Sequence, residues 1–175
     1  WRQPVFFDAS LEPDVASIRQ AEQVARWVRQ HDVCVLLNTR INSQASSWAS
    51  KLGFTGAHLG QSALQAYQSE NNLRQLCRKD GLERVAVSCH NQRELQQAKA
   101  LGADFAVLGP VNKTTSHINA TPMLWHGFKS LALEAGLPTY ALGGCERADV
   151  AMACQNGGQG VAAISGLWPK LEAKA

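Results

Sequence analysis

The chain has 175 residues, of which 45% are hydrophobic and 18% are charged. This length suits one domain with a substantial core, so we expect residues 1–175 to form a single folded domain. The net charge of +3 is spread along the chain without a basic run, which argues against nucleic-acid binding by this domain. No apolar run reaches the roughly 20 residues that a membrane-spanning helix needs, so no membrane contact is expected.

The cysteines indicate a reducing compartment. The five cysteines form no C-x-x-C pair and no cluster with the spacing of zinc ligands. Cysteines used singly in an α/β pattern are typical of reduced thiols, so we expect a cytoplasmic protein.

Short apolar runs alternate with segments of helical period through the first half of the chain. Strands are predicted at Val5–Phe7, Val33–Leu37 and Gly56–Gly60. The second run is apolar enough for a parallel strand that is buried on both faces. Helices are predicted at about 14–30, 45–52 and 72–79.

The same alternation continues to the end of the chain. Further strands are predicted at Arg84–Ser88, Asp104–Leu108, Thr139–Leu142 and Gly160–Ile164. A helix at about 92–101 has Asn91 as its candidate N-cap, and another ends at Ala135 before Gly136. A helix near 148–155 and a short closing helix complete the pattern.

These elements make seven strand-then-helix units, and the right-handed crossover rule makes their strands parallel neighbours. An open doubly wound sheet and a closed barrel both satisfy this rule. Polar or glycine residues follow most strands and no G-x-G-x-x-G fingerprint occurs, which favours the barrel. We therefore predict a (β/α)8 TIM barrel whose first strand is absent from this chain or is supplied from upstream.

Two glycine-bearing turns, Gly143-Gly144 and Ser165-Gly166, follow the last two predicted strands. Glycine lets the backbone approach a ligand closely, and free N–H groups at helix N-termini favour an anion. The last two loops of a barrel are its usual phosphate site. The sequence therefore predicts phosphate binding here, although tight turns alone would use the same residues.

Hydroxyl and imidazole groups gather in the loop Thr114-Thr115-Ser116-His117. Hydroxyls donate to phosphate oxygens, and histidine adds charge or transfers a proton. Ser88 ends a neighbouring strand, so Thr114, Ser116, His117 and Ser88 are candidate ligand contacts. A solvated turn would use similar residues.

Asn38 and Arg40 end the second predicted strand and are further ligand candidates. Asn38 offers hydrogen bonds, and Arg40 pairs either with an anion or with an internal carboxylate. Catalytic residues stay unassigned. No metal site is predicted, because Asp8 is the only clear carboxylate at a strand end.

His58 and His90 are expected to be hydrogen-bonded structural residues. Cys89 precedes His90 directly, and adjacent residues of a strand point to opposite faces. A nucleophilic Cys-His pair is therefore not expected.

Several motifs occur in order from about Val33 onward: Leu36-Leu37-Asn38-Thr39-Arg40, Gly56-Ala57-His58-Leu59-Gly60-Gln61, Val87-Ser88-Cys89-His90, Gly102-Ala103-Asp104, Gly109-Pro110, Thr114-Thr115-Ser116-His117, Leu142-Gly143-Gly144 and the 160–165 run. Together they resemble the thiamine phosphate synthase and TenI superfamily of α/β barrels. The resemblance implies a ligand that is a small phosphorylated heterocycle, thiazole phosphate or thiamine phosphate.

The resemblance also implies which charged residues the synthase reaction would require. The synthase holds a pyrimidine diphosphate with a basic pair on its second strand, with magnesium on two aspartates and with a loop lysine. Here Val5–Ser10 lacks the basic pair, Thr39 and Ser62 or Ala63 stand at the aspartate positions, and His117 stands at the lysine position. Mg²⁺ is expected only if synthase activity remains. TenI-type tautomerases have a histidine where this chain has Pro110.

The segments Thr139–Gly144 and Ser165-Gly166-Leu167-Trp168 are similar to a barrel that some bacterial proteins carry behind a MutT-like Nudix hydrolase domain. This similarity implies a covalently linked Nudix domain upstream of Trp1, with its hydrolase activity outside this chain. Three hypotheses follow. The first is a phosphate-binding barrel with weakened or lost transfer, the second is an active synthase with Asp8, Arg40 or His117 as relocated ligands, and the third is a regulatory or structural barrel attached to the Nudix enzyme.

Overall fold

The computed structural model describes residues 5–8, 34–39, 53–66, 82–114, 120–163 and 165–167, and single helical positions at 23, 26, 27, 30, 31 and 75. Its strands are β1 (Val5–Asp8), β2 (Val35–Thr39), β3 (Gly56–Leu59), β4 (Arg84–Cys89), β5 (Phe105–Leu108), β6 (Thr139–Leu142) and β7 (Gly160–Ala162). Its helices are α3 (Gln61–Ala66), α5 (Gln92–Ala100), α6 (Leu124–Ala135) and α7 (Val150–Gln155), with 3-10 turns η1 (Arg147–Asp149) and η2 (Ser165–Leu167).

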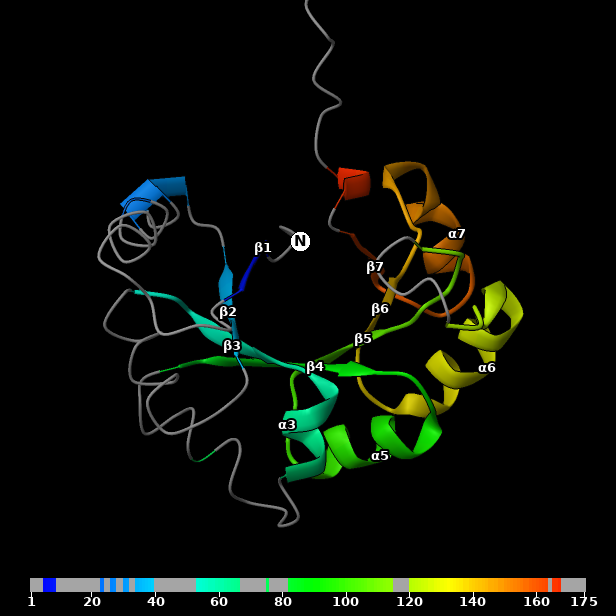
Figure 1. Cartoon of the computed structure of the whole chain (residues 1–175), viewed down its shortest axis with the longest axis horizontal. Coiled ribbons are helices and arrows are strands. Elements are labelled where there is room, and N and C mark those ends of the chain that lie inside the picture. Colours follow the sequence, from blue (N-terminus) through cyan, green and yellow to red (C-terminus); the bar gives the residue numbers. More distant parts are fainter. Residues whose placement is uncertain are drawn as a thin grey trace, which may run out of the picture.

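The seven strands form one sheet in chain order, and every neighbouring pair is parallel. A parallel neighbour requires the chain to cross back over the sheet between strands. Figure 1 shows the sheet curving, with α3, α5, α6 and α7 on its outer side and with β1 and β7 at the two ends of the curve. The predicted α/β fold with parallel strands and barrel-like curvature is confirmed.

Side chains of the strands divide into an outer and an inner set, because successive strand residues point to opposite faces. The outer set, which includes Val85, Val87 and Cys89 of β4, packs with Leu95 of α5 and Phe128 of α6 in the main core. The inner set forms a second cluster of Val107, Tyr140 and Ala162, with Phe105 and Leu142 against it. The alternation assigns Ser88, which lies between Val87 and Cys89, to the inner side of the sheet.

Two strand boundaries differ from the prediction in a way that matters for function. Strand β2 runs over Val35–Thr39 and not over Val33–Leu37, because Asn38 and Thr39 continue the ladder opposite His58 and Leu59. Asn38 is therefore part of the strand and not of the loop after it. Strand β5 begins one residue after Asp104, whose carboxylate accepts a hydrogen bond from the Val85 N–H at 2.7 Å.

Helix α5 confirms its predicted cap, because the Asn91 side chain accepts a hydrogen bond from the Glu94 N–H at 3.0 Å. Helix α6 ends at Ala135, as predicted, and Gly136 follows with φ of 63°. The predicted 148–155 helix begins as η1 and continues as α7. Helix α3 was not predicted, since its six residues are too few to show a helical period. The predictions for 45–52 and for most of 14–30 and 72–79 lie outside the described residues.

Candidate functional site

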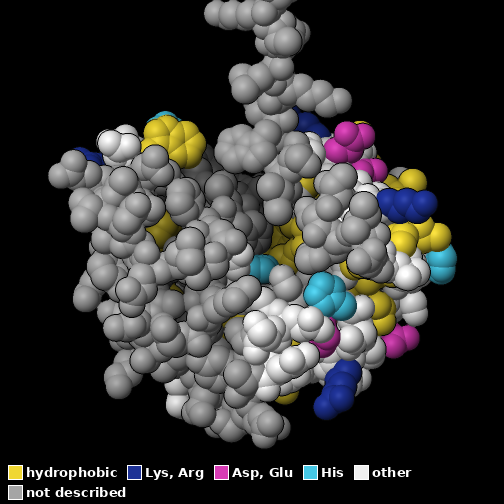
Figure 2. All heavy atoms as spheres, viewed as in Figure 1, with side chains coloured by type: hydrophobic (Ala, Val, Ile, Leu, Met, Phe, Trp, Pro, Cys, Tyr) yellow, Lys and Arg dark blue, Asp and Glu magenta, His cyan; other side chains and the backbone are white. Residues whose placement is uncertain are grey.

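The loops that follow the parallel strands all leave from the same edge of the sheet, its carboxyl edge. Among the described residues, hydrogen bonds and close packing join these loops to one another. Figure 2 shows this molecule hollowed at its centre, where hydrophobic side chains and a histidine side chain are visible. We take the carboxyl edge as the candidate site.

Ser88 and His58 form a hydrogen-bonded pair on the inner side of the sheet. Nε2 of His58 lies 2.8 Å from Oγ of Ser88. His58 is only 7% exposed, and this burial lowers the pKa of its imidazole to about 4. The imidazole is therefore neutral near pH 7, and the pair holds Ser88 as an oriented, uncharged hydroxyl.

Glu94, on the first turn of α5, connects the loops after β3 and β4. Its buried carboxylate accepts hydrogen bonds from Gln61 Nε2 at 2.7 Å, Asn91 Nδ2 at 3.0 Å and the His90 backbone N–H at 2.6 Å. The N-terminus of a helix also favours a negative charge. Sequence reasoning missed this role of Glu94, although Asn91-x-x-Glu94 is the pattern of a reciprocal helix cap.

The loop after β5 is tied to its neighbours on both sides. Nδ1 of His90 lies 2.6 Å from the carbonyl oxygen of Gly109. On the other side, Val111 N–H donates to the Leu142 carbonyl at 2.8 Å and Asn112 N–H donates to the Gly143 carbonyl at 2.9 Å. The loops after β4, β5 and β6 thus form one connected rim.

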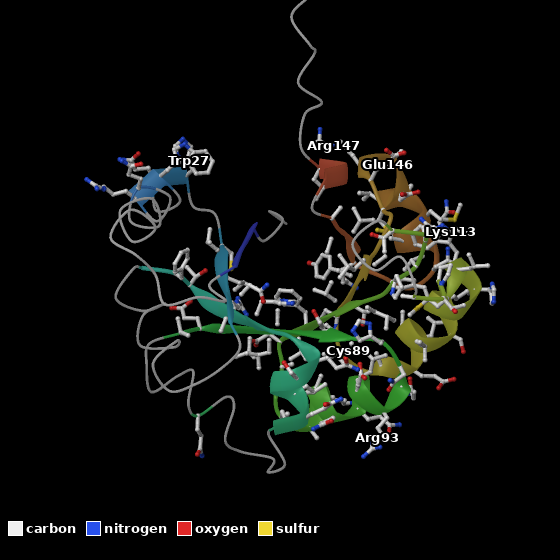
Figure 3. All side chains as sticks on the ribbon, viewed as in Figure 1. Trp27, Cys89, Arg93, Lys113, Glu146 and Arg147 are labelled. Carbon is white, nitrogen blue, oxygen red and sulfur yellow. The ribbon has the colours of Figure 1, made fainter. Side chains whose placement is uncertain are left out.

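Gly143 and Gly144 form the turn after β6, with φ of 94° and 60°. Only glycine adopts such values without strain, and a Cβ at Gly144 would lie 2.2 Å from the Lys113 carbonyl oxygen. The hydrogen bonds of the described residues include none donated by the N–H of Gly143 or of Gly144. The turn therefore brings two backbone N–H groups, which have no acceptor among the described residues, against the β5 loop, where Lys113 is exposed (Figure 3).

The structure brings together some of the predicted site residues and leaves others undescribed. Asn38 is half-buried opposite His58, and Thr114 is half-buried at the end of the described β5 loop. Gly166 packs closely on the Cys145 carbonyl, so the loop after β7 adjoins the loop after β6. The backbone of Ser165 lies in η2. Arg40, Ser116 and His117 lie outside the described residues.

The buried thiols at this edge are not nucleophiles. Burial raises the pKa of Cys89, with the negative charge of Glu94 adding to it, to about 12. Burial and Asp149 likewise raise the pKa of Cys145 to about 12. The thiolate is the reactive form, so both side chains stay inert near neutral pH. Cys89 packs in the outer core and the neighbouring His90 is exposed, which agrees with the prediction that they form no nucleophilic pair.

Comparison with known families identifies the chain. The family described as "Thiamine monophosphate synthase" matches residues 8–167. The chain belongs to the thiamine monophosphate synthase family. Among the described residues, no helix is both long and apolar enough to cross a bilayer.

Curated relatives of this family match the chain over part of their length. A thiamine-phosphate synthase of Lysinibacillus sphaericus is 36% identical over 68% of this chain and 54% of that protein. A putative thiamine-phosphate synthase of Geobacter sulfurreducens is 31% identical over 84% of this chain and 64% of that protein. A putative thiamine-phosphate synthase 2 of Aquifex aeolicus is 36% identical over 46% of this chain and 44% of that protein. The chain thus spans 44% to 64% of these relatives.

Solved structures agree on the fold. Thiamine phosphate pyrophosphorylase from Pyrococcus furiosus superposes with a TM-score of 0.71 at 16% identity, over 92% of this chain and 71% of that one. A structure titled "Native KDPGal structure" superposes with a TM-score of 0.59 at 14% identity, over 99% of this chain and 89% of that one. At these identities the likeness shows the fold alone.

Magnesium was expected only with synthase activity, and the described residues of this family member do not fit it. They contain no group of three or more His, Cys, Asp or Glu side chains that could hold a metal ion. Carboxylate oxygens are the ligands that Mg²⁺ prefers, and Thr39 ends β2 where the family resemblance places an aspartate. We therefore derive no step through a metal.

The Gly143-Gly144 turn makes a stability prediction. Gly144→Ala places a Cβ on the Lys113 carbonyl at a positive φ, so we expect it to destabilise the fold by about 1–3 kcal/mol. Gly60→Ala is the matched control, because its Cβ would meet no atom within 4 Å. Urea unfolding of both variants measures the difference, and equal stabilities would contradict the geometry of the turn.

The neutral state of His58 makes a pH prediction. The pKa of its imidazole is about 4 in the folded protein and 6.5 ordinarily, so between these values the unfolded chain binds more protons. Stability that depends on His58 is therefore present above pH 6.5 and decreases, by up to about 1.4 kcal/mol per pH unit, as the pH falls towards 4.

His58→Gln is the matched variant, because the Gln amide nitrogen replaces Nε2 beside Ser88 and does not titrate. The free energy of unfolding is measured with urea at about pH 7.5, 6.0 and 5.0. It should decrease more steeply with falling pH in the parent protein than in the variant. Parallel losses in the two proteins would show that His58 is not buried in its neutral form.

Proposed function

We propose that this chain is a thiamine-phosphate-synthase-like barrel that binds a small phosphorylated heterocycle, thiazole phosphate or thiamine phosphate, at its carboxyl edge. In this proposal, metal-dependent transfer is weakened or lost. The observation that carries it is the Gly143-Gly144 turn, whose two N–H groups have no acceptor among the described residues.

The phosphate group would bind at this turn. Successive backbone N–H groups at a turn with positive φ form an anion-binding concavity. The β5 loop packs against Gly144 and supplies the exposed cation Lys113 and the hydroxyl of Thr114. Gly166 lies against the same turn through Cys145, so the predicted phosphate residues Gly143, Gly144 and Gly166 share one region. Ser165, Ser116 and His117 remain proposed contacts.

The ring of the ligand would lie on the inner side of the sheet. The Ser88 hydroxyl, fixed by His58, is a polar contact there, and half-buried Asn38 is a second one on β2. The inner cluster of Val107, Leu142 and its neighbours gives an apolar wall next to them. An apolar wall with a few fixed polar groups is the usual lining of a small-molecule site. Arg40 remains a proposed ligand contact from the sequence.

The proposal of weakened transfer is supported by the absence of a metal-binding group among the described residues. Departure of a diphosphate requires cations or a metal to stabilise its developing negative charge. The described carboxyl edge presents no carboxylate cluster for a metal, and the one buried carboxylate there, Glu94, already accepts three hydrogen bonds. An active synthase with Asp8, Arg40 or His117 as relocated ligands is the alternative that a turnover assay would reveal.

The domain boundaries also remain proposals. We propose that residues 1–175 belong to one barrel domain that an eighth strand completes, since no pairing joins β1 to β7 among the described residues. A barrel closes only when its edge strands pair. An upstream Nudix domain, and a regulatory or structural role beside it, stay predictions from the sequence.

Calorimetric titration with thiamine phosphate and with thiazole phosphate tests the proposed function. We expect binding of at least one of them and an affinity about 10- to 100-fold weaker in Ser88→Ala, which removes a hydroxyl from the ligand site. Ser130→Ala, on the exposed side of α6, is the matched control and should bind as the parent does. No heat from either compound would refute phosphate binding.

The same protein should be assayed with the pyrimidine diphosphate, thiazole phosphate and Mg²⁺. Little or no thiamine phosphate is expected. Rapid formation that decreases in Asp8→Ala or His117→Ala would establish the active synthase instead.

A further inference from the structure

We infer that His90 is a positioning residue, whose imidazole fixes the loop after β5 and, through it, the Gly143-Gly144 turn. The link to ligand affinity rests on the proposed function, whereas the link to the loop rests on hydrogen bonds alone. His90 does not need to touch the ligand in this account.

The contact between His90 and Gly109 has one possible direction. Nδ1 lies 2.6 Å from the Gly109 carbonyl oxygen, and a carbonyl oxygen only accepts. Nδ1 therefore carries the hydrogen. Both the neutral tautomer with that hydrogen and the imidazolium donate this bond, so the contact survives protonation of the ring.

The His90 backbone is anchored before its ring reaches across to the next loop. Its N–H donates to Glu94 Oε2 at 2.6 Å, and Oε1 of the same carboxylate is held by Gln61 and Asn91. Glu94 is only 7% exposed. The His90 ring thus extends from a backbone that its hydrogen bond to Glu94 holds in place.

Gly109 is the residue of the β5 loop to which the His90 ring is hydrogen-bonded. Its N–H donates to the Cys89 carbonyl at 3.1 Å, and a Cβ on it would lie 2.3 Å from the Leu142 carbonyl oxygen. The residue is therefore enclosed between β4 and β6. Its carbonyl group, which His90 holds, sets the orientation of the peptide that leads into Pro110.

The two residues that follow Gly109 are hydrogen-bonded to the start of α6. Met123 N–H donates to the Pro110 carbonyl and Leu124 N–H donates to the Val111 carbonyl, each at 2.9 Å. These bonds hold Pro110 and Val111 next to Met123 and Leu124. The Asn112 bond to Gly143 then transmits the position of this loop to the glycine turn. Losing the His90 donor would loosen the loop and the turn together.

Two substitutions of His90 distinguish the hydrogen bond that Nδ1 donates to Gly109 from the other properties of the imidazole ring. The amide nitrogen of His90→Asn takes the place of Nδ1 and keeps the hydrogen bond, whereas that of His90→Gln takes the place of Nε2 and does not. Both replacements are polar and uncharged, and His90 is exposed, so neither disturbs the core. Any difference between them reports the Nδ1 position.

Limited trypsin digestion without ligand is the first measurement. Lys113 is exposed in the loop, and Arg93 is an exposed residue of α5 that serves as the internal control for global unfolding (Figure 3). We expect cleavage after Lys113 to be about three- to tenfold faster in His90→Gln and close to the parent rate in His90→Asn, with cleavage after Arg93 unchanged. Faster hydrogen exchange at the Met123 and Leu124 amides of His90→Gln is the second readout.

Thiamine phosphate titration of the same proteins is the third measurement. The affinity of His90→Gln should be about three- to tenfold weaker than that of His90→Asn. Equal cleavage and exchange in the two variants would overturn the positioning role. If the parent protein binds no phosphorylated ligand while the loop readouts still differ, the proposed function fails and the role of His90 in the loop stands.

Discussion

The hydrogen bonds of the Glu94 carboxylate are the interaction on which the carboxyl edge of this curved sheet depends. A buried carboxylate is tolerated only when its oxygens are hydrogen-bonded, and this one accepts from Gln61, Asn91 and the His90 backbone. Gln61 begins α3 directly after β3, and His90 and Asn91 lie between β4 and α5. The His90 ring extends the connection to Gly109, and the β5 loop extends it to Gly143. Hydrogen bonds that begin at one carboxylate thus connect consecutive strand ends into one rim.

The rim belongs to a member of the thiamine monophosphate synthase family, and the described residues contain no group of side chains that could hold a metal ion. Backbone hydrogen bonds and buried polar side chains hold the rim together, and these contacts do not require a metal. The outer core holds the strands against α5 and α6, and the inner cluster gives the site an apolar wall. We propose that ligand binding and group transfer depend on different residues and that only the binding residues are preserved.

The strands were predicted well because strands buried on both faces are short apolar runs, as β4 and β6 illustrate. The Gly143-Gly144 turn was predictable too, since paired glycines after a strand mark positive φ. The role of Glu94 was not, because its bond to Gln61 joins residues 33 positions apart and no local pattern carries such a contact. The Gly109 contact of His90 was hidden for the same reason, and Ser116 and His117 lie outside the described residues.

We propose that two backbone N–H groups, those of Gly143 and Gly144, receive the phosphate of the ligand. Amide chemical shifts of ¹⁵N-labelled protein during titration with thiamine phosphate test it most directly. Our account predicts that the Gly143 and Gly144 amide protons move downfield by more than those of other residues, with smaller changes in the β5 loop. Saturable binding that leaves both amides unmoved would contradict the account.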